Sequence, residues 1–239
     1  MSGKLYVVGT PIGNLGDISP RALEILASVN FIAAEDTRVT LKLLNHFEIK
    51  NELISYFEHN KKERGNTVIE KILAGETCAI VTDAGMPCIS DPGELLIKQC
   101  EEYGIKTVVV PGPSAVISAL CVSGLATGRF CFEGFLPQKK GRQTRLMELS
   151  EETRTMIFYE SPYRLVKTLE QFAEFFGGDR ECSVAREISK KFEEHKRGTL
   201  TDVAAWYKEH EPKGEIVIIV AGAPEKKKEK KSYHKADED

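Results

Sequence analysis

Short apolar runs alternate with segments of helical periodicity along the first half of the chain. The apolar runs are Leu5–Val8, Phe31–Ala34, Cys78–Thr82 and Lys106–Val110. Helices are expected from Ser19-Pro20 onward, at about Thr67–Ala74, and at Gly93–Tyr103. Continuous apolar strands that alternate with helices are typical of a parallel sheet covered by helices. The first half of the chain is therefore predicted to be an α/β unit.

The pattern changes after residue 128, where a second set of strands and helices is expected. The predicted strands are Phe130–Phe135, Thr155–Tyr159, Glu181–Arg186 and Glu215–Val220, and the predicted helices are Tyr163–Phe176 and Thr201–His210. We predict two α/β domains, over residues 1–114 and 115–224, with the second more mixed in strand direction. Residues 225–239 are rich in Lys and Glu without apolar periodicity, so they are predicted to form a disordered charged tail.

Composition narrows the class of protein. With 41% hydrophobic and 29% charged residues, the 239-residue chain is typical of a globular protein, and no apolar run reaches membrane-spanning or signal-peptide length. We therefore expect a cytoplasmic protein without a membrane partner. The six cysteines form no CxxC pair and the five histidines show no metal-ligand spacing, so neither a disulfide nor a metal site is expected.

Three loops that follow predicted strands are rich in glycine and proline. They cover residues 9–17, 83–93 and 111–115. Ligands in open α/β sheets bind beyond the carboxyl ends of the strands, and glycine lets the backbone approach a ligand closely. The loops carry neither GxxxxGK[ST] nor GxGxxG, and they offer acids and hydroxyls rather than a phosphate-binding lysine. This chemistry suits a phosphate-free cationic ligand with ribose hydroxyls, such as S-adenosylmethionine, although the loops could instead simply turn the chain.

The candidate cofactor-binding residues lie in these loops and after two strands of the second half. They are Pro11, Asp83, Ala84, Gly85, Met86, Ser90, Ser114, Ala115, Tyr159 and Arg186. The competing interpretation is structural, because proline, aspartate and serine at such positions also serve as turn residues and helix caps.

Candidate RNA contacts come from exposed cations. The formal net charge of −3 means that nucleic acid would be bound by a local basic patch. The segment from Pro137 to Arg145 holds four cations and no acid, which indicates a phosphate-binding loop. The candidates are Arg38, Lys139, Lys140, Arg142 and Arg145. The alternatives are a solvated loop for the last four and an internal ion pair with Asp36 for Arg38.

Four residues are candidates for a general base or another catalytic role: Asp36, Glu160, Glu187 and Lys190. Each follows a predicted strand or lies one turn beyond it. Lys190 could accept a proton only if a dry site lowered its pKa. A solvated charge run is the alternative for Glu187 and Lys190.

The motifs VVGTPIGNLGD, AAEDTR, VTDAGMPCISDPG, VVPGPSA, FEGFLP, FYESPYR and AREISKKFEE lie between Val7 and Glu194. In kind and order they resemble the tetrapyrrole (corrin/porphyrin) methylase family, and the last three together with EDTR resemble its ribosomal branch. The resemblance implies two α/β domains with S-adenosylmethionine in the cleft between them, and a homodimer. It also implies 2′-O-methylation of a cytidine ribose in the decoding region of 16S ribosomal RNA, with the assembled small subunit as the expected partner.

Two other functions remain open at this point. An enzyme of the same fold could methylate a small tetrapyrrole or a modified amino acid on a protein, and it would not need the basic segment. A noncatalytic RNA-binding or assembly module would not bind S-adenosylmethionine, so calorimetry with that cofactor separates it from the methylases.

Overall fold

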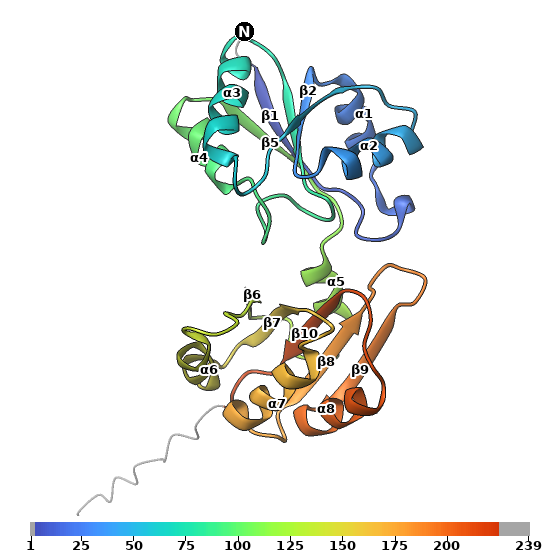
Figure 1. Ribbon diagram of the computed structural model, residues 1–239, viewed down its shortest axis with the longest axis vertical. Coiled ribbons are helices and arrows are strands. Elements are labelled where there is room, and N and C mark those ends of the chain that lie inside the picture. Colours follow the sequence, from blue (N-terminus) through green and yellow to red (C-terminus); the bar gives the residue numbers. More distant parts are fainter. Residues whose placement is uncertain (1–2, 225–239) are drawn as a thin grey trace, which may run out of the picture.

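The computed structural model describes residues 3–224, which form two five-stranded sheets (Figure 1). The predicted tail over residues 225–239 lies outside the described residues. The strands of the first sheet, in spatial order, are β3 (Glu52–Ser55), β2 (Phe31–Ala34), β4 (Cys78–Val81), β1 (Lys4–Val8) and β5 (Lys106–Val110). Every neighbouring pair in this sheet is parallel, as the apolar pattern predicts.

Helices cover both faces of the first sheet (Figure 1). They are α1 (Pro20–Ser28), α2 (Thr37–His46), α3 (Lys61–Leu73) and α4 (Glu94–Glu102), and a short 3₁₀ helix, η1, spans Leu15–Asp17. Because successive strand side chains point to opposite faces, Phe31 packs with α3 and α4 while Ile32 packs with α1 and α2. The predicted α1 begins where expected, with Ser19 as its N-cap and Pro20 in its first turn.

The second sheet is mixed. In spatial order its strands are β6 (Phe130–Phe135), β7 (Thr155–Glu160), β10 (Ile216–Val220), β8 (Glu181–Arg186) and β9 (Glu194–Thr199). Only β6 and β7 are parallel, and the other neighbouring pairs are antiparallel. One face packs on α6 (Arg142–Ser150), α7 (Leu165–Phe176) and α8 (Leu200–Glu209). The opposite face packs on α5 (Ala115–Val122), which lies between the two sheets in Figure 1.

Strand order brings the three glycine- and proline-rich loops together. The strands β4, β1 and β5 are neighbours and parallel, so the loops that follow them leave the same edge of the sheet. Thr10 and Gly85 exchange two backbone hydrogen bonds, of 2.9 and 3.1 Å, and these join the first loop to the second. A Cβ on Gly9 would lie 2.7 Å from the Cα of Gly112, so only glycine allows the first and third loops to approach this closely.

Candidate functional site

Two cavities lie at this edge of the first sheet. The central cavity, of about 420 Å³, is lined by residues of the loops and of the second sheet: Ile12, Ala84, Ser90, Asp91, Ala115, Phe135, Tyr159, Glu160, Ser161, Pro162, Ala185, Ile188, Gly214, Glu215, Ile216 and Val217. The adjoining cavity, of about 430 Å³, is lined by Pro11, Ile12, Gly13, Leu15, Val39, Thr40, Lys42, Leu43, Thr82, Asp83, Ala84, Lys190 and Glu215. Ile12, Ala84 and Glu215 line both cavities, so the two share a wall.

The central cavity is apolar with an acidic side. Its lining contains three carboxylates, those of Asp91, Glu160 and Glu215, and none of its lining residues is Lys, Arg or His. Such a cavity disfavours a phosphate-bearing ligand and suits a neutral or cationic one. The adjoining cavity differs, because Lys42 and Lys190 are part of its lining.

Asp91 is a lining residue of the central cavity whose pKa is shifted. Burial and then the nearby Glu35 carboxylate raise the pKa of Asp91 to about 6, while a hydrogen bond from Thr82 opposes this rise. The Thr82 hydroxyl also donates to Glu35 Oε2 at 2.5 Å. A positive charge placed beside Asp91 would favour its ionised form, so the site gains from a cationic ligand.

Most of the predicted cofactor-binding residues converge on the cavities. Ala84, Ser90, Ala115 and Tyr159 line the central cavity. Gly85, Met86 and Ser114 line a recess of about 30 Å³ that shares Ala84, Ala115 and Tyr159 with the central cavity, whereas Pro11 and Asp83 line the adjoining cavity. Ser114 occupies the N-cap position of α5 but its side chain makes no capping hydrogen bond, so its hydroxyl is not used as a helix cap.

Arg186 is the exception among these residues. Its guanidinium donates to Glu194 at 3.5 Å and to the carbonyl of Lys213 at 3.2 Å, which holds it away from the central cavity. Its strand neighbour Ala185 lines the cavity instead, because adjacent residues of a strand point to opposite faces. The structure therefore does not place Arg186 in the lining of the central cavity, where its neighbour Ala185 lies.

None of the four candidate catalytic residues is a free base. Arg38 donates to Asp36 Oδ2 at 2.6 Å and holds the pKa of that carboxyl at about 2. Asp36 is the N-cap of α2, so its carboxylate has a structural role. Glu160 is only 5% exposed, and its two carboxylate oxygens accept from Ser161 N, Arg164 Nε and Thr168 Oγ1 at 2.7–2.8 Å.

Glu187 and Lys190 form an ion pair of 2.8 Å, and Lys190 makes a second one of 3.1 Å with Glu215. Burial acts to lower the pKa of Lys190, but the hydrogen bonds to Glu187 and Glu215 outweigh it and hold that pKa above its usual value. The pKa of Glu187 is lowered, chiefly by the hydrogen bond from Lys190. Lys190 is thus a cation at neutral pH, and the lowered pKa that it would need in order to accept a proton is not found.

The basic segment is only partly a loop, because α6 begins at Arg142. Arg142 is 8% exposed and donates to Gln171, to the Pro137 carbonyl and to Thr168, so it is an internal structural residue and is withdrawn as an RNA contact. Arg145 is ion-paired with Glu133 and Glu148.

Three of the predicted RNA-contact residues stay accessible to a ligand. Lys139 and Lys140 are exposed, and no ion pair involving either occurs within residues 3–224. Arg38 pairs with Asp36, as the alternative interpretation has it, but its side chain is 86% exposed, so an RNA contact stays a prediction.

The sequence interpretation missed residues that the second sheet brings to the central cavity. Phe135, Ile188, Gly214 and Val217 line it; Phe135 and Ile188 lie within the FEGFLP and AREISKKFEE motifs, but their apolar side chains gave no sign of a binding role. Asp91 lies in the second glycine-rich loop. Its burial beside Glu35 depends on the pairing of β2 and β4, which are distant in sequence.

Metal-binding groups, disulfides and membrane-spanning helices are not found in the described part of the chain. No group of three or more His, Cys, Asp or Glu side chains is arranged to hold a metal ion within residues 3–224. All six cysteines are unpaired. No helix formed by the described residues is long and apolar enough to span a membrane.

Fold and site together define a two-domain α/β protein that holds a small ligand at the carboxyl edge of a parallel sheet. Residues 4–204 match the family described as Tetrapyrrole (Corrin/Porphyrin) Methylases. The chain belongs to this family, and the two-domain α/β fold expected from the motifs is confirmed.

Named relatives support the same assignment. The chain is 50% identical over 222 residues to the ribosomal RNA small subunit methyltransferase I of Synechocystis sp. The aligned region covers 92% of this chain and 80% of that protein. It is 47% identical over 220 residues to the protein of the same name from Thermotoga maritima, covering 92% and 99% of the two chains. Among solved structures, uroporphyrin-III C-methyl transferase from Thermus thermophilus, complexed with S-adenyl homocysteine, matches with a TM-score of 0.65. That match has 18% identity and covers 92% of this chain and 97% of the other.

Proposed function

We propose that this methylase transfers a methyl group from S-adenosylmethionine to the 2′-hydroxyl of a cytidine ribose in the decoding region of 16S ribosomal RNA. The observation that carries the proposal is the contrast between the two cavities that share a wall. Asp91 of the central cavity has no ion pair within residues 3–224, which suits a cationic methyl donor, and exposed Lys42 of the adjoining cavity has none there either, which suits an anionic RNA. Relatives about half identical to the chain carry names that place their activity on small-subunit ribosomal RNA.

The residues of the central cavity fit S-adenosylmethionine. Apolar side chains such as Ala185 and Val217, together with the ring of Tyr159, would hold the adenosine, and the Asp91 carboxylate would favour the positive charge. When bound, the cofactor supplies a methyl group on a sulfonium, which is already activated. The protein then mainly has to exclude water and hold the acceptor in place.

The adjoining cavity would hold the nucleotide that is methylated. Leu15, Val39 and Leu43 give it an apolar wall, and Lys42 is an exposed cation at the same cavity that could contact a phosphate. Because the two cavities share Ile12 and Ala84, a sugar held in one lies next to a donor held in the other. Holding two reactants in line can supply roughly 7–11 kcal/mol of a barrier, more than a general base normally contributes.

Asp83 is the residue best placed to receive the proton of the ribose hydroxyl. It lines the adjoining cavity, and its Oδ1 accepts from the backbone N of Asp36 at 3.1 Å, which orients the carboxylate and leaves Oδ2 for the substrate. Burial, followed by the nearby Glu35, raises the pKa of Asp83 above its usual value. A raised pKa makes this carboxylate a better proton acceptor than Asp36 or Glu187.

The wider RNA surface would include Lys139 and Lys140, which follow Phe135 of the central cavity by only a few residues. Loop cations of this kind contact phosphates and position a folded RNA without reading its sequence. The proposal includes the assembled small subunit as substrate, a homodimer as the working form, and a cytoplasmic location.

Labelled methyl transfer to small ribosomal subunits tests the proposed function. Subunits from a strain that lacks the corresponding methylase are incubated with the protein and methyl-labelled S-adenosylmethionine, and nuclease digestion then maps the label. We expect the label on the 2′-oxygen of one cytidine. The double variant Lys139→Ala/Lys140→Ala should lower transfer several-fold, and Lys98→Ala on α4 should not. Label on a base, on a protein or only on an added tetrapyrrole would refute the proposal.

Cofactor affinity should depend on pH through Asp91. A folded-state pKa of about 6 means that the free protein keeps a proton on Asp91 below pH 6, whereas a cationic ligand binds best to the carboxylate. Affinity for S-adenosylmethionine should therefore rise as the pH increases from 5 to 7 and then level off, with roughly tenfold weaker binding at pH 5 than at pH 7.5. Isothermal titration calorimetry between pH 5 and 7.5 measures how the Kd for S-adenosylmethionine changes with pH.

Two comparisons isolate the contribution of Asp91 to this slope. Asp91→Asn should flatten the pH dependence, because the side chain no longer titrates. S-adenosylhomocysteine lacks the sulfonium charge and should show a shallower slope on the wild-type protein. If Asp91→Asn keeps the full pH dependence, another group controls it.

A further inference from the structure

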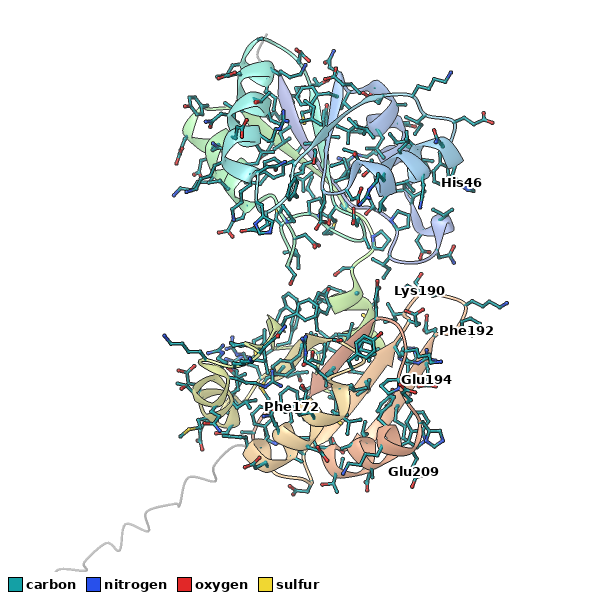
Figure 2. The ribbon with its side chains drawn as sticks, viewed as in Figure 1. His46, Phe172, Lys190, Phe192, Glu194 and Glu209 are labelled. Carbon is teal, nitrogen blue, oxygen red and sulfur yellow. The ribbon has the colours of Figure 1, made fainter. Side chains whose placement is uncertain are left out.

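An exposed phenylalanine lies in the loop between β8 and β9. Phe192 is 65% exposed, although large apolar side chains are normally covered. Figure 2 shows Phe192 and Lys190 on this loop, which extends from the second sheet toward the first domain. Lys190 lines the adjoining cavity, so the loop forms part of the same site.

The loop is held in place by its own hydrogen bonds. Ser189 N donates to Glu193 Oε2 at 2.6 Å, Lys190 N to the Glu187 carbonyl at 3.0 Å, and Glu193 N to the Lys190 carbonyl at 3.2 Å. The Ser189 hydroxyl donates to the Asp17 carboxylate, which ties the loop to the first domain. The Phe192 ring is therefore presented by a structured turn.

The backbone of the turn also carries strain. Glu187 and Ser189 have φ values of 52° and 64°, in the left-handed region that non-glycine residues rarely adopt. Strain of this kind concentrates at functional sites, where the surrounding structure holds it in place. The strained backbone and the exposed Phe192 ring thus belong to one structured turn beside the adjoining cavity.

The charge beside the ring indicates the chemistry of that partner. Lys191 Nζ lies 5.5 Å from the centroid of the Phe192 ring, and no ion pair of Lys191 occurs within residues 3–224. A flat aromatic face next to a cation that lacks a carboxylate partner matches a nucleotide, whose base stacks and whose phosphate is anionic. A purely apolar protein partner would not favour the unpaired cation.

We propose that Phe192 stacks on an unpaired base of the RNA substrate, beside the nucleotide whose sugar enters the adjoining cavity, while Lys191 contacts the phosphate backbone. This inference rests on the proposed function and deepens it, because it assigns to the loop over residues 187–193 the recognition of single-stranded RNA. Sequence-specific RNA recognition relies mostly on such splayed bases, because the deep, narrow major groove of paired RNA is difficult to read.

Steady-state kinetics with small ribosomal subunits test the proposal. Phe192→Ala and Phe192→Leu should each raise KM by about 5- to 100-fold, the range expected for losing one stacked base, while kcat changes little. Phe192→Trp should keep KM close to the wild-type value, because tryptophan also offers an aromatic face for stacking. Affinity for S-adenosylmethionine should stay unchanged in all three variants. The matched control is Tyr103→Ala, which removes an exposed aromatic ring (58%) at the end of α4.

A direct spectroscopic readout is possible because the chain has one tryptophan, Trp206. In a Trp206→Phe background, Phe192→Trp places the only indole in the loop, and stacking on a base should quench its fluorescence when small subunits are added. Subunits already carrying the methyl group serve as a second ligand that binds without turnover.

Several results would overturn the proposal. A wild-type KM for Phe192→Leu would show an apolar contact without stacking, and a wild-type KM for Phe192→Ala would show no contact. A changed molar mass of Phe192→Ala in light scattering would place the ring between two copies of this chain. If the wild-type protein transfers no methyl group, the proposed function fails separately, and the quenching measurement still decides whether Phe192 meets RNA.

Discussion

Replacing Ala84 by tryptophan is expected to abolish methyl transfer without unfolding the protein. Ala84 lines the central cavity, the adjoining cavity and the small recess, so a large side chain there would occupy the space of both ligands. Misplacement of a reactant by about 1 Å already costs about 10²-fold in rate, and we expect Ala84→Trp to lose at least that much in both cofactor affinity and transfer. Calorimetry with S-adenosylmethionine and the subunit methylation assay measure the two effects.

The stability of the Ala84 variant should change little, because Ala84 is exposed and follows the end of β4. The matched control is Ala74→Trp, which adds the same ring to another exposed alanine at the C-cap of α3. Wild-type cofactor affinity in Ala84→Trp would mean that the methyl donor binds elsewhere, and the assignment of both cavities would fail with it.

Replacing Glu160 by alanine is expected to destabilise the fold by about 1–3 kcal/mol, the cost of leaving buried hydrogen-bonding groups without a partner. Glu160 accepts three hydrogen bonds, from Ser161 N, Arg164 Nε and Thr168 Oγ1. Alanine would leave the Arg164 and Thr168 donors without their acceptor. The turn after β7 would lose the hydrogen bonds that hold it in place. Ser161 and Pro162 of that turn line the central cavity, so the cavity would be affected as well. Urea unfolding followed by circular dichroism measures the loss.

Two controls separate this structural role from a catalytic one. Glu148→Ala removes an exposed carboxylate that pairs with Arg145, and such surface pairs are worth about 1 kcal/mol or less. Glu160→Gln keeps an oxygen acceptor and should retain more of the stability. A Glu160→Ala variant that is as stable as the wild type yet inactive would restore Glu160 as a base and contradict the structural role.

Strands rich in β-branched and other apolar residues were the elements most open to prediction from sequence. Phe31–Ala34 and Lys106–Val110 have the same bounds in the structure as in the pattern, and so do Phe130–Phe135 and Glu181–Arg186. The first two lie in the parallel sheet, whose strands are apolar runs bounded by turn residues. These runs, together with the helix signals at Ser19 and Pro20, were sufficient to predict the α/β class.

Polar elements at the edges of the sheets escaped prediction. The strand β9 reads EHKRGT and has no apolar pattern, and it forms because its backbone pairs with β8 along six residues. The helices α2 and α6 were hidden by charged motifs that were interpreted as binding loops. In both cases the acid or cation supports the fold: Asp36 caps α2, and the buried Arg142 joins α6 to α7 through Gln171 and Thr168.

The sequence by itself determined the local chemistry of this protein: the parallel-sheet strands, the three glycine-rich loops, and the acids and hydroxyls that those loops carry. These properties follow from periodicity and from backbone freedom at single residues, which act over a few positions. Only the tertiary structure decided which charges are free. In the sequence, Arg142, Glu160 and Lys190 cannot be told from accessible functional groups, yet each is held by partners between 1 and 29 positions away. Availability for chemistry depends on neighbours in space, and the packing of two sheets sets these neighbours.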